Sequence, residues 1–167
     1  MEKDFQDLAR ELGQAIAEVL RAHATAFDGR PVAGLALCPV DDYLVPYLAV
    51  VCAEGDAPPE DLHDPWSPEE MGEQISNERL DQATGRTHDL ADAWPDEDWD
   101  SFGPLLREAL VTALGSGEVQ EALASIGWDP MLYLYLVEEG RVDRASLATL
   151  NPGRQGDPEY RALARLG

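Results

Sequence analysis

Positive charge is scarce in this sequence of 167 residues, in which 12 lysines and arginines stand against 33 acidic residues. The net charge is −21, and Lys3 is the single lysine. Nucleic acids and anionic membranes attract proteins through clustered basic side chains, which this chain lacks. We therefore expect neither nucleic acid nor a membrane as a partner. A basic protein partner, a bound cation or a need for solubility alone would each account for such acidity.

Cysteines and long apolar runs are scarce as well. Cys38 and Cys52 are the only cysteines, and both lie in apolar stretches, as small buried thiols do in a reducing compartment. They are too few for a disulfide framework or a zinc cluster. No apolar run approaches the ~18 residues of a membrane helix, and the first residues lack the plan of a signal peptide. We expect a cytoplasmic protein with a single acidic domain over residues 1–167.

The acidic residues are concentrated in the middle of the chain. Residues 56–103 hold 15 acidic and two basic residues, and so carry −13 of the net charge of −21. A requirement for solubility would explain the total charge but not its crowding into one segment. If the acidity has a binding role, we expect it in this segment.

Hydrophobic periodicity predicts the secondary structure of the first third of the chain. Apolar residues recur every three or four positions over residues 5–27, which predicts an amphipathic helix. Two apolar runs, residues 32–38 and 44–52, then predict a β-hairpin with both faces covered. In such a hairpin Cys38 and Cys52 lie too far apart to form a disulfide.

The middle of the chain gives weaker signals. Ser67-Pro68-Glu69-Glu70 has the form of a capping box, so a short helix should run from Pro68 to Ile75 or Glu78. Residues 81–93 are predicted to form a loop, because Thr84-Gly85 marks a turn. Beyond this loop, periodicity predicts helices over residues 102–114, 119–126, 145–150 and 158–166.

One further strand is expected in the second half of the chain. Residues 131–137 alternate aromatic and aliphatic side chains without a charge, which predicts a well-buried strand that pairs with the hairpin. The side chains expected to be nearly inaccessible to solvent are Leu35, Leu37, Leu48, Val50, Leu134 and Leu136. The predicted fold class is α+β, with a small, mainly antiparallel sheet made of the hairpin and this strand and covered by helices.

The run from Trp94 to Asp100 allows two interpretations. In the structural one, Asp98 or Asp100 caps the helix that follows, and the two tryptophans pack its entry against the core. In the functional one, the run is an exposed acidic surface with aromatic anchors that receives a basic protein. Its predicted partner-binding residues are Trp94, Asp96, Glu97, Asp98, Trp99 and Asp100.

Specific signatures of catalysis are not found in the sequence. It contains no phosphate-binding glycine loop, no nucleophile elbow and no HExxH helix. Two pairs, His63-Asp64 and His88-Asp89, could converge on a divalent metal, although adjacent residues rarely point at the same ion. We therefore predict no catalytic residue, no metal ligand and no cofactor.

A set of residues in the first half of the chain resembles a known family. Leu35-Ala36-Leu37 leads to Asp41-Asp42, a proline follows inside the return strand, and Trp66-Ser67-Pro68-Glu69-Glu70 comes next. In this order the chain resembles a bacterial domain-of-unknown-function family (DUF 4303-like) from Gly34 to Val137. The resemblance implies a small stand-alone cytosolic protein without catalytic residues. It also implies an immunity-type role in toxin systems for some members.

These observations together favour a non-enzymatic protein-interaction domain that binds a basic protein partner. The concentrated charge and the missing catalytic signature agree with this hypothesis. Two alternatives stay open. One is a bacterial housekeeping domain whose acidity serves only solubility, and the other is a metal-dependent hydrolase.

Overall fold

The computed structural model describes residues 2–40, 46–52, 67–95 and 98–167. The first half contains α1 (Glu2–His23), the 3-10 helix η1 (Ala24–Phe27), β1 (Val32–Cys38), β2 (Tyr47–Cys52), α2 (Pro68–Met71), β3 (Gly72–Ile75) and α3 (Glu78–Asp92). The second half contains α4 (Trp99–Leu114), α5 (Gly117–Ile126), β4 (Met131–Leu136), η3 (Val137–Glu139), β5 (Arg141–Val142), α6 (Arg144–Leu150) and α7 (Pro158–Leu163).

The strands form one sheet in the order β3-β2-β1-β4-β5. The β1–β2, β2–β3 and β4–β5 pairs are antiparallel, whereas β1 and β4 are parallel, with Leu35 beside Leu132 and Leu37 beside Leu134. The predicted α+β class and the mainly antiparallel sheet are therefore confirmed. The hairpin of β1 and β2 and its pairing with β4 are confirmed as well.

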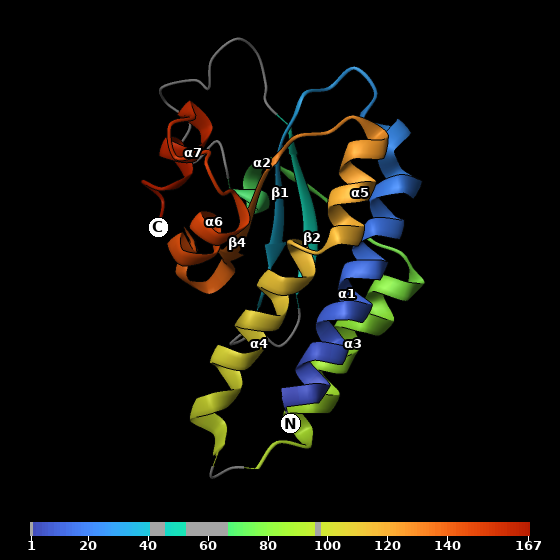
Figure 1. Cartoon of the computed structure of the whole chain (residues 1–167), viewed down its shortest axis with the longest axis vertical. Coiled ribbons are helices and arrows are strands. Elements are labelled where there is room, and N and C mark those ends of the chain that lie inside the picture. The colour runs from blue at the N-terminus through green and yellow to red at the C-terminus, as the bar shows by residue number, and fades with distance from the viewer. Residues whose placement is uncertain (1, 41–45, 53–66, 96–97) are drawn as a thin grey trace.

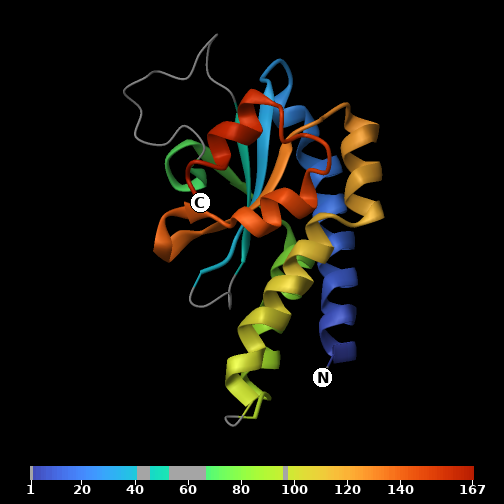
Figure 2. The same ribbon diagram turned by 60° about the vertical axis from the view of Figure 1, so that its left-hand side comes forward.

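Helices cover both faces of the sheet (Figures 1 and 2). On one face, Leu35, Leu48 and Leu134 pack in a core with buried residues of α1, α3, α4 and α5. On the other, Ala36, Ala49 and Tyr133 pack with residues that include Leu147 of α6 and Leu163 of α7. Alternate residues of each strand thus enter opposite cores, which is why the strands are apolar at nearly every position.

The predicted core is confirmed. Leu35, Leu37, Leu48, Val50 and Leu134 are fully inaccessible, and Leu136 is 7% exposed. Both cysteines are free and buried. Burial raises the pKa of the Cys38 thiol, and this outweighs the opposing effect of the hydrogen bond with Tyr47. The Cys38 thiol is therefore protonated at neutral pH and unreactive.

The helix predicted from Pro68 to Ile75 or Glu78 is wrong beyond its first turn. It ends at Met71, and Gly72 to Ile75 form β3, which pairs with β2. Gly72 lies against the first residue of α2, and a Cβ added there would collide with backbone atoms of Pro68. The glycine allows this close approach. The residues that follow it form a strand because they pair with the edge of β2.

The loop predicted over residues 81–93 is wrong as well, because α3 occupies Glu78–Asp92. Its start is an Asn77 N-cap, whose side chain accepts a hydrogen bond from the N–H of Leu80 at 2.8 Å. Gly85 lies within the helix with open space around it. Packing against α1 stabilises the helix despite this glycine, which shows tertiary contacts outweighing local propensity.

The outer edge of β4 is paired with side chains of the C-terminal segment. The Asn151 side chain accepts a bond from the N–H of Leu132 at 3.0 Å and donates to its carbonyl at 2.7 Å. Ser146 Oγ accepts a bond from the N–H of Leu134 at 3.2 Å. The Asp143 N–H donates to the Leu134 carbonyl at 3.0 Å, so α6 takes the place of a neighbouring strand along this edge.

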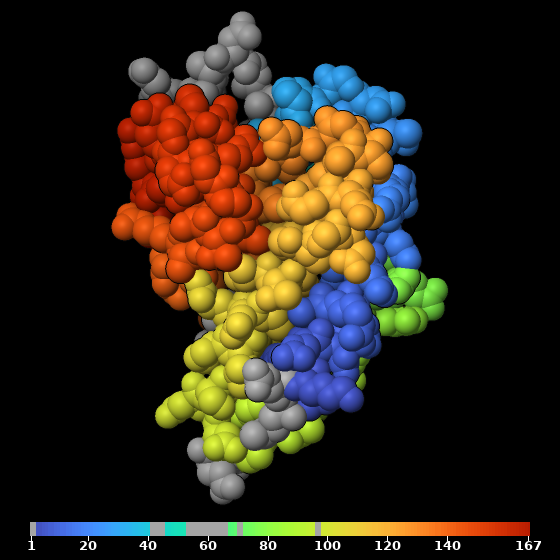
Figure 3. Space-filling view, in the orientation of Figure 1, coloured from blue at the N-terminus to red at the C-terminus, as the bar shows by residue number. Residues whose placement is uncertain are grey.

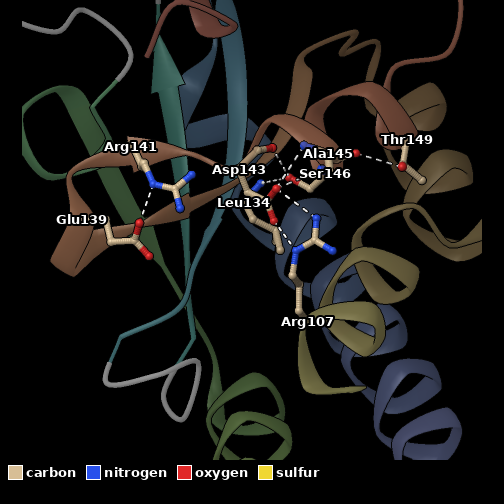
Figure 4. A network of polar contacts seen from close by, with 8 residues as sticks. All are labelled: Arg107, Leu134, Glu139, Arg141, Asp143, Ala145, Ser146 and Thr149. Atoms are coloured by element: carbon tan, nitrogen blue, oxygen red, sulfur yellow. Dashed lines mark hydrogen bonds and ion pairs between the residues drawn. The ribbon is translucent and has the colours of Figure 1, made fainter. Parts of the chain in front are cut away.

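Asp143 also links α6 to α4 (Figure 4). Its carboxylate receives two hydrogen bonds from the Arg107 guanidinium, one of them at 2.9 Å, and caps α6 through the N–H groups of Ala145 and Ser146. Burial acts to raise the pKa of this carboxyl, but the bonds and charge of Arg107, with the two N–H groups, lower it below its ordinary value. Asp143 is therefore ionised in the folded protein.

Candidate partner-binding site

The predicted partner-binding run lies where the chain passes from α3 to α4. In Figure 1 these two helices extend beyond the sheet to the lower end of the molecule, next to the start of α1. Trp94 follows α3, Asp98 precedes α4, and Trp99 and Asp100 begin it. The predicted residues Asp96 and Glu97 lie outside the described residues.

Trp94 is buried, not exposed as an anchor would be. It is 8% exposed and lies in an aromatic cluster, with ring centroids 5.4 Å from Phe5 of α1 and 5.5 Å from Phe102 of α4. Its indole N–H donates to the carbonyl of Asp98 at 3.0 Å. The structural interpretation is thus supported for Trp94, which holds the start of α4 against α1.

Trp99 behaves differently. At 43% exposure it is the one exposed large hydrophobic side chain among the described residues. Its ring stacks on Phe102, with centroids 5.0 Å apart and planes at 5°. Because one face of the indole is held by Phe102, the ring is oriented before any partner arrives, which reduces the entropy lost on binding.

The carboxylates on either side of Trp99 are exposed. Asp98 occupies the N-cap position of α4, but its side chain makes no capping hydrogen bond. Asp100 lies in the first turn, where the helix dipole favours an acid. The capping interpretation therefore does not account for the Asp98 carboxylate.

Two more carboxylates come from the last turn of α3. Asp92 begins the acidic stretch, Asp92 to Asp100, that the sequence predicted to be part of the binding surface, whereas Asp89 lies in a segment predicted to be a loop. Asp89 and Asp92 are both exposed there. Acids at the C-terminal end of a helix oppose its dipole and destabilise it. We call the exposed group Asp89, Asp92, Asp98, Trp99 and Asp100 the acidic tip.

The arginines of the middle segment do not neutralise the acidic tip. Residues 56–103 contain only Arg79 and Arg86 as basic residues. Both point at α1, where Arg79 pairs with Glu18 and Arg86 pairs with Glu11. Within the described part of the chain, the four carboxylates of the acidic tip form no ion pair, so their charges face solvent together.

The acidic tip has the chemistry to bind a basic side chain. A guanidinium can form two parallel hydrogen bonds with a carboxylate. It can also lie over an indole ring, an arrangement that contributes about 0.5–2 kcal/mol depending on how far it is removed from water. The acidic tip presents both groups side by side.

One of the two His-Asp pairs noted in the sequence lies among the described residues. His88 and Asp89 lie exposed on α3, and the second pair, His63 and Asp64, is outside the described ranges. In the ranges that are described, no three histidine, cysteine or acidic side chains gather as a metal site would require. Convergence of the two pairs on a metal therefore lies outside what the described residues test.

Comparisons with models of protein families, with curated protein sequences and with solved structures found no match. The resemblance to the DUF 4303-like family stays a prediction. No helix among the described residues is both long enough and apolar enough to cross a membrane. A function is therefore inferred from the side chains of the acidic tip.

Proposed function

We propose that the protein is a non-enzymatic interaction protein that binds a basic protein partner through the acidic tip. On the basis of the family resemblance, we propose that it acts as an immunity-type protein in a toxin system. Trp99 carries the proposal, because it is exposed, is oriented by Phe102 and stands between two exposed carboxylates. Aromatic anchors within complementary charge are common at the centre of interfaces.

The electrostatics of the acidic tip also support this proposal. The four carboxylates are exposed and form no ion pair within the described part of the chain, and two of them oppose the dipole of α3. These carboxylates destabilise the free protein. A bound cation would neutralise them and so stabilise the complex. The same field repels phosphate groups, which argues against nucleic acid as the partner.

Neutralising the acidic tip should slow association with a cationic probe. We suggest a peptide of alternating arginine and alanine, with a citrulline version as its uncharged counterpart. Replacing Asp98 and Asp100 by Asn should lower the association rate for the arginine peptide about 3- to 10-fold at low salt, with a flatter salt dependence and little change in dissociation. Stopped-flow or surface-binding kinetics at several salt concentrations would measure this.

The matched control removes two charges elsewhere. Glu121 on α5 and Glu159 on α7 are exposed, and their replacement by Gln changes the net charge equally. If this control slows association as much as the Asp98 and Asp100 pair does, the acidity acts as a whole and serves solubility. Thermal melting of both variants would separate binding from stability.

Removing the indole of Trp99 should raise the dissociation rate of the arginine peptide, with little effect on its association rate. Trp99→Ala should weaken binding of the arginine peptide about 3- to 30-fold, the range of a cation–π contact, mainly through faster dissociation. Trp99→Phe keeps a ring on Phe102 and should recover part of the loss. Equal affinities of wild type and Trp99→Ala would contradict the role of Trp99.

A further inference from the structure

A cleft of about 260 Å³ lies between α1 and α4. In Figure 3 the yellow surface of α4 and the blue surface of α1 meet there, below the orange surface of α5. Phe5 and Ala9 of α1 and Leu105 and Ala109 of α4 form its apolar walls. Phe5 also packs against Phe102, on which Trp99 stacks, so one aromatic cluster links the wall of the cleft to Trp99.

Two alanines line the cleft, one from each helix. Ala9 and Ala109 are both about 4% exposed, and neither side chain is long enough to fill the space between the helices. Small-molecule sites usually have about 300–1,000 Å³, so this cleft is small for a cofactor. Its size and apolar walls suit a single apolar side chain.

The rim of the cleft is acidic. Among the described residues that line it, Arg10 is the one cation, and it is paired with Asp7 at 2.6 Å. Glu108 and Glu118 are exposed and form no ion pair within the described part of the chain. A second copy of this chain, with a net charge of −21, would be repelled from such a rim, whereas a basic segment would be attracted.

We propose that the cleft receives an apolar side chain from a basic amphipathic helix of the partner. The inference rests on the proposed function and adds to it the part of the partner that is recognised. Basic residues of that helix contact the acidic tip and the acidic rim, and one leucine or phenylalanine enters the cleft beside Leu105. The acidic tip then raises the association rate, while the cleft lowers the dissociation rate of basic proteins that carry a suitable apolar side chain.

The test compares two synthetic helical peptides of equal positive charge. One carries leucines along one face, and in the other each leucine is replaced by alanine. Burial of one leucine should make the leucine peptide bind the wild-type protein about 10-fold more tightly. Chemical-shift changes in the protein should then centre on Ala9, Leu105 and Ala109.

Blocking variants separate the cleft from the acidic tip. Thr112 is exposed at the rim, so Thr112→Phe should fill the cleft and remove the preference for leucine. Thr149→Phe makes the same change at an exposed position on α6, outside the cleft, and should leave the preference intact. If Thr112→Phe lowers the melting temperature, Gln6→Phe fills the cleft from the opposite wall.

The outcomes distinguish the two proposals. Equal binding of both peptides by the wild type, or a preference that survives Thr112→Phe and Gln6→Phe, would overturn the role of the cleft. In that case the Asp98 and Asp100 variant would still slow both peptides. If that variant binds both peptides as the wild type does, the proposed function fails and the cleft proposal fails with it.

Discussion

Replacing Asp143 by Ala should lower the free energy of unfolding by about 3 kcal/mol, since the change removes two hydrogen bonds between the carboxylate and the charged Arg107 guanidinium. Asp143 is 7% exposed and holds α6 to α4 through Arg107. The change also removes the N-cap of α6, a loss of about 1 kcal/mol by itself and part of the total. Urea denaturation near neutral pH would measure the effect.

The same experiment in acid should show a smaller difference. The pKa of Asp143 is lower in the folded protein than in the unfolded chain, because Arg107 and two N–H groups outweigh the effect of burial. The stabilisation is therefore fully present above the unfolded pKa of about 3.9 and is lost as the pH falls through the folded pKa.

Asp143→Asn keeps the capping oxygen without the charge, so its free energy of unfolding should lie between those of wild type and Asp143→Ala. Identical stability of Asp143→Asn and wild type at neutral pH would show that the ion pair contributes nothing.

Truncation of Leu134 to Ala should cost about 2–5 kcal/mol, as at other fully buried leucines. Leu134 is completely inaccessible and lies beside Leu37 in the parallel pair of β1 and β4. Because the sheet and the α1, α4 and α5 layer enclose the site, the cavity left by the side chain cannot collapse easily. Denaturant unfolding of the variant would measure the loss.

Leu166 provides a matched comparison for this variant. It is partly buried near the end of the chain and packs against the second core. Leu166→Ala should cost about 1 kcal/mol, since less apolar surface leaves water there on folding. A Leu134→Ala loss no larger than that of Leu166→Ala would contradict the central position assigned to β4.

Elements with a strong hydrophobic period were predictable from the sequence. The stripe that begins at Phe5 predicted α1, and the uncharged runs predicted β1, β2 and β4. Each of these patterns reflects burial of one helix face or of both strand faces. The spacing of apolar residues along the sequence is enough to predict burial of that kind.

The middle of the chain was harder because its structure depends on contacts distant in sequence. α3 buries mainly small or polar side chains, such as Ala83, Thr84 and Thr87, which give little periodic signal. The Asn77 N-cap was the available sequence signal, and the turn expected at Thr84-Gly85 obscured it. β3 has only Ile75 as a buried residue, so pairing with β2 defines it.

The candidate site was predictable in composition but not in geometry. Trp94 and Trp99 have similar acidic neighbours in sequence. Their opposite exposures depend on Phe5, which comes from the far end of the chain and packs with Trp94. Asp89 and Asp92 join the acidic tip only because α3 is a helix that ends beside α4.

The side chains along the outer edge of β4 cover the part of that edge that β5 does not pair with, and we expect this to oppose self-association. An open edge on a strand as apolar as Met131–Leu136 would be a template for strand pairing between molecules, the first step towards aggregation. Asn151 and Ser146 occupy the hydrogen-bonding groups of Leu132 and Leu134 with side chains, and a side chain cannot propagate a sheet. A chain truncated before Asp143 would lose this protection, and its high negative charge would then be the main barrier left against fibril growth.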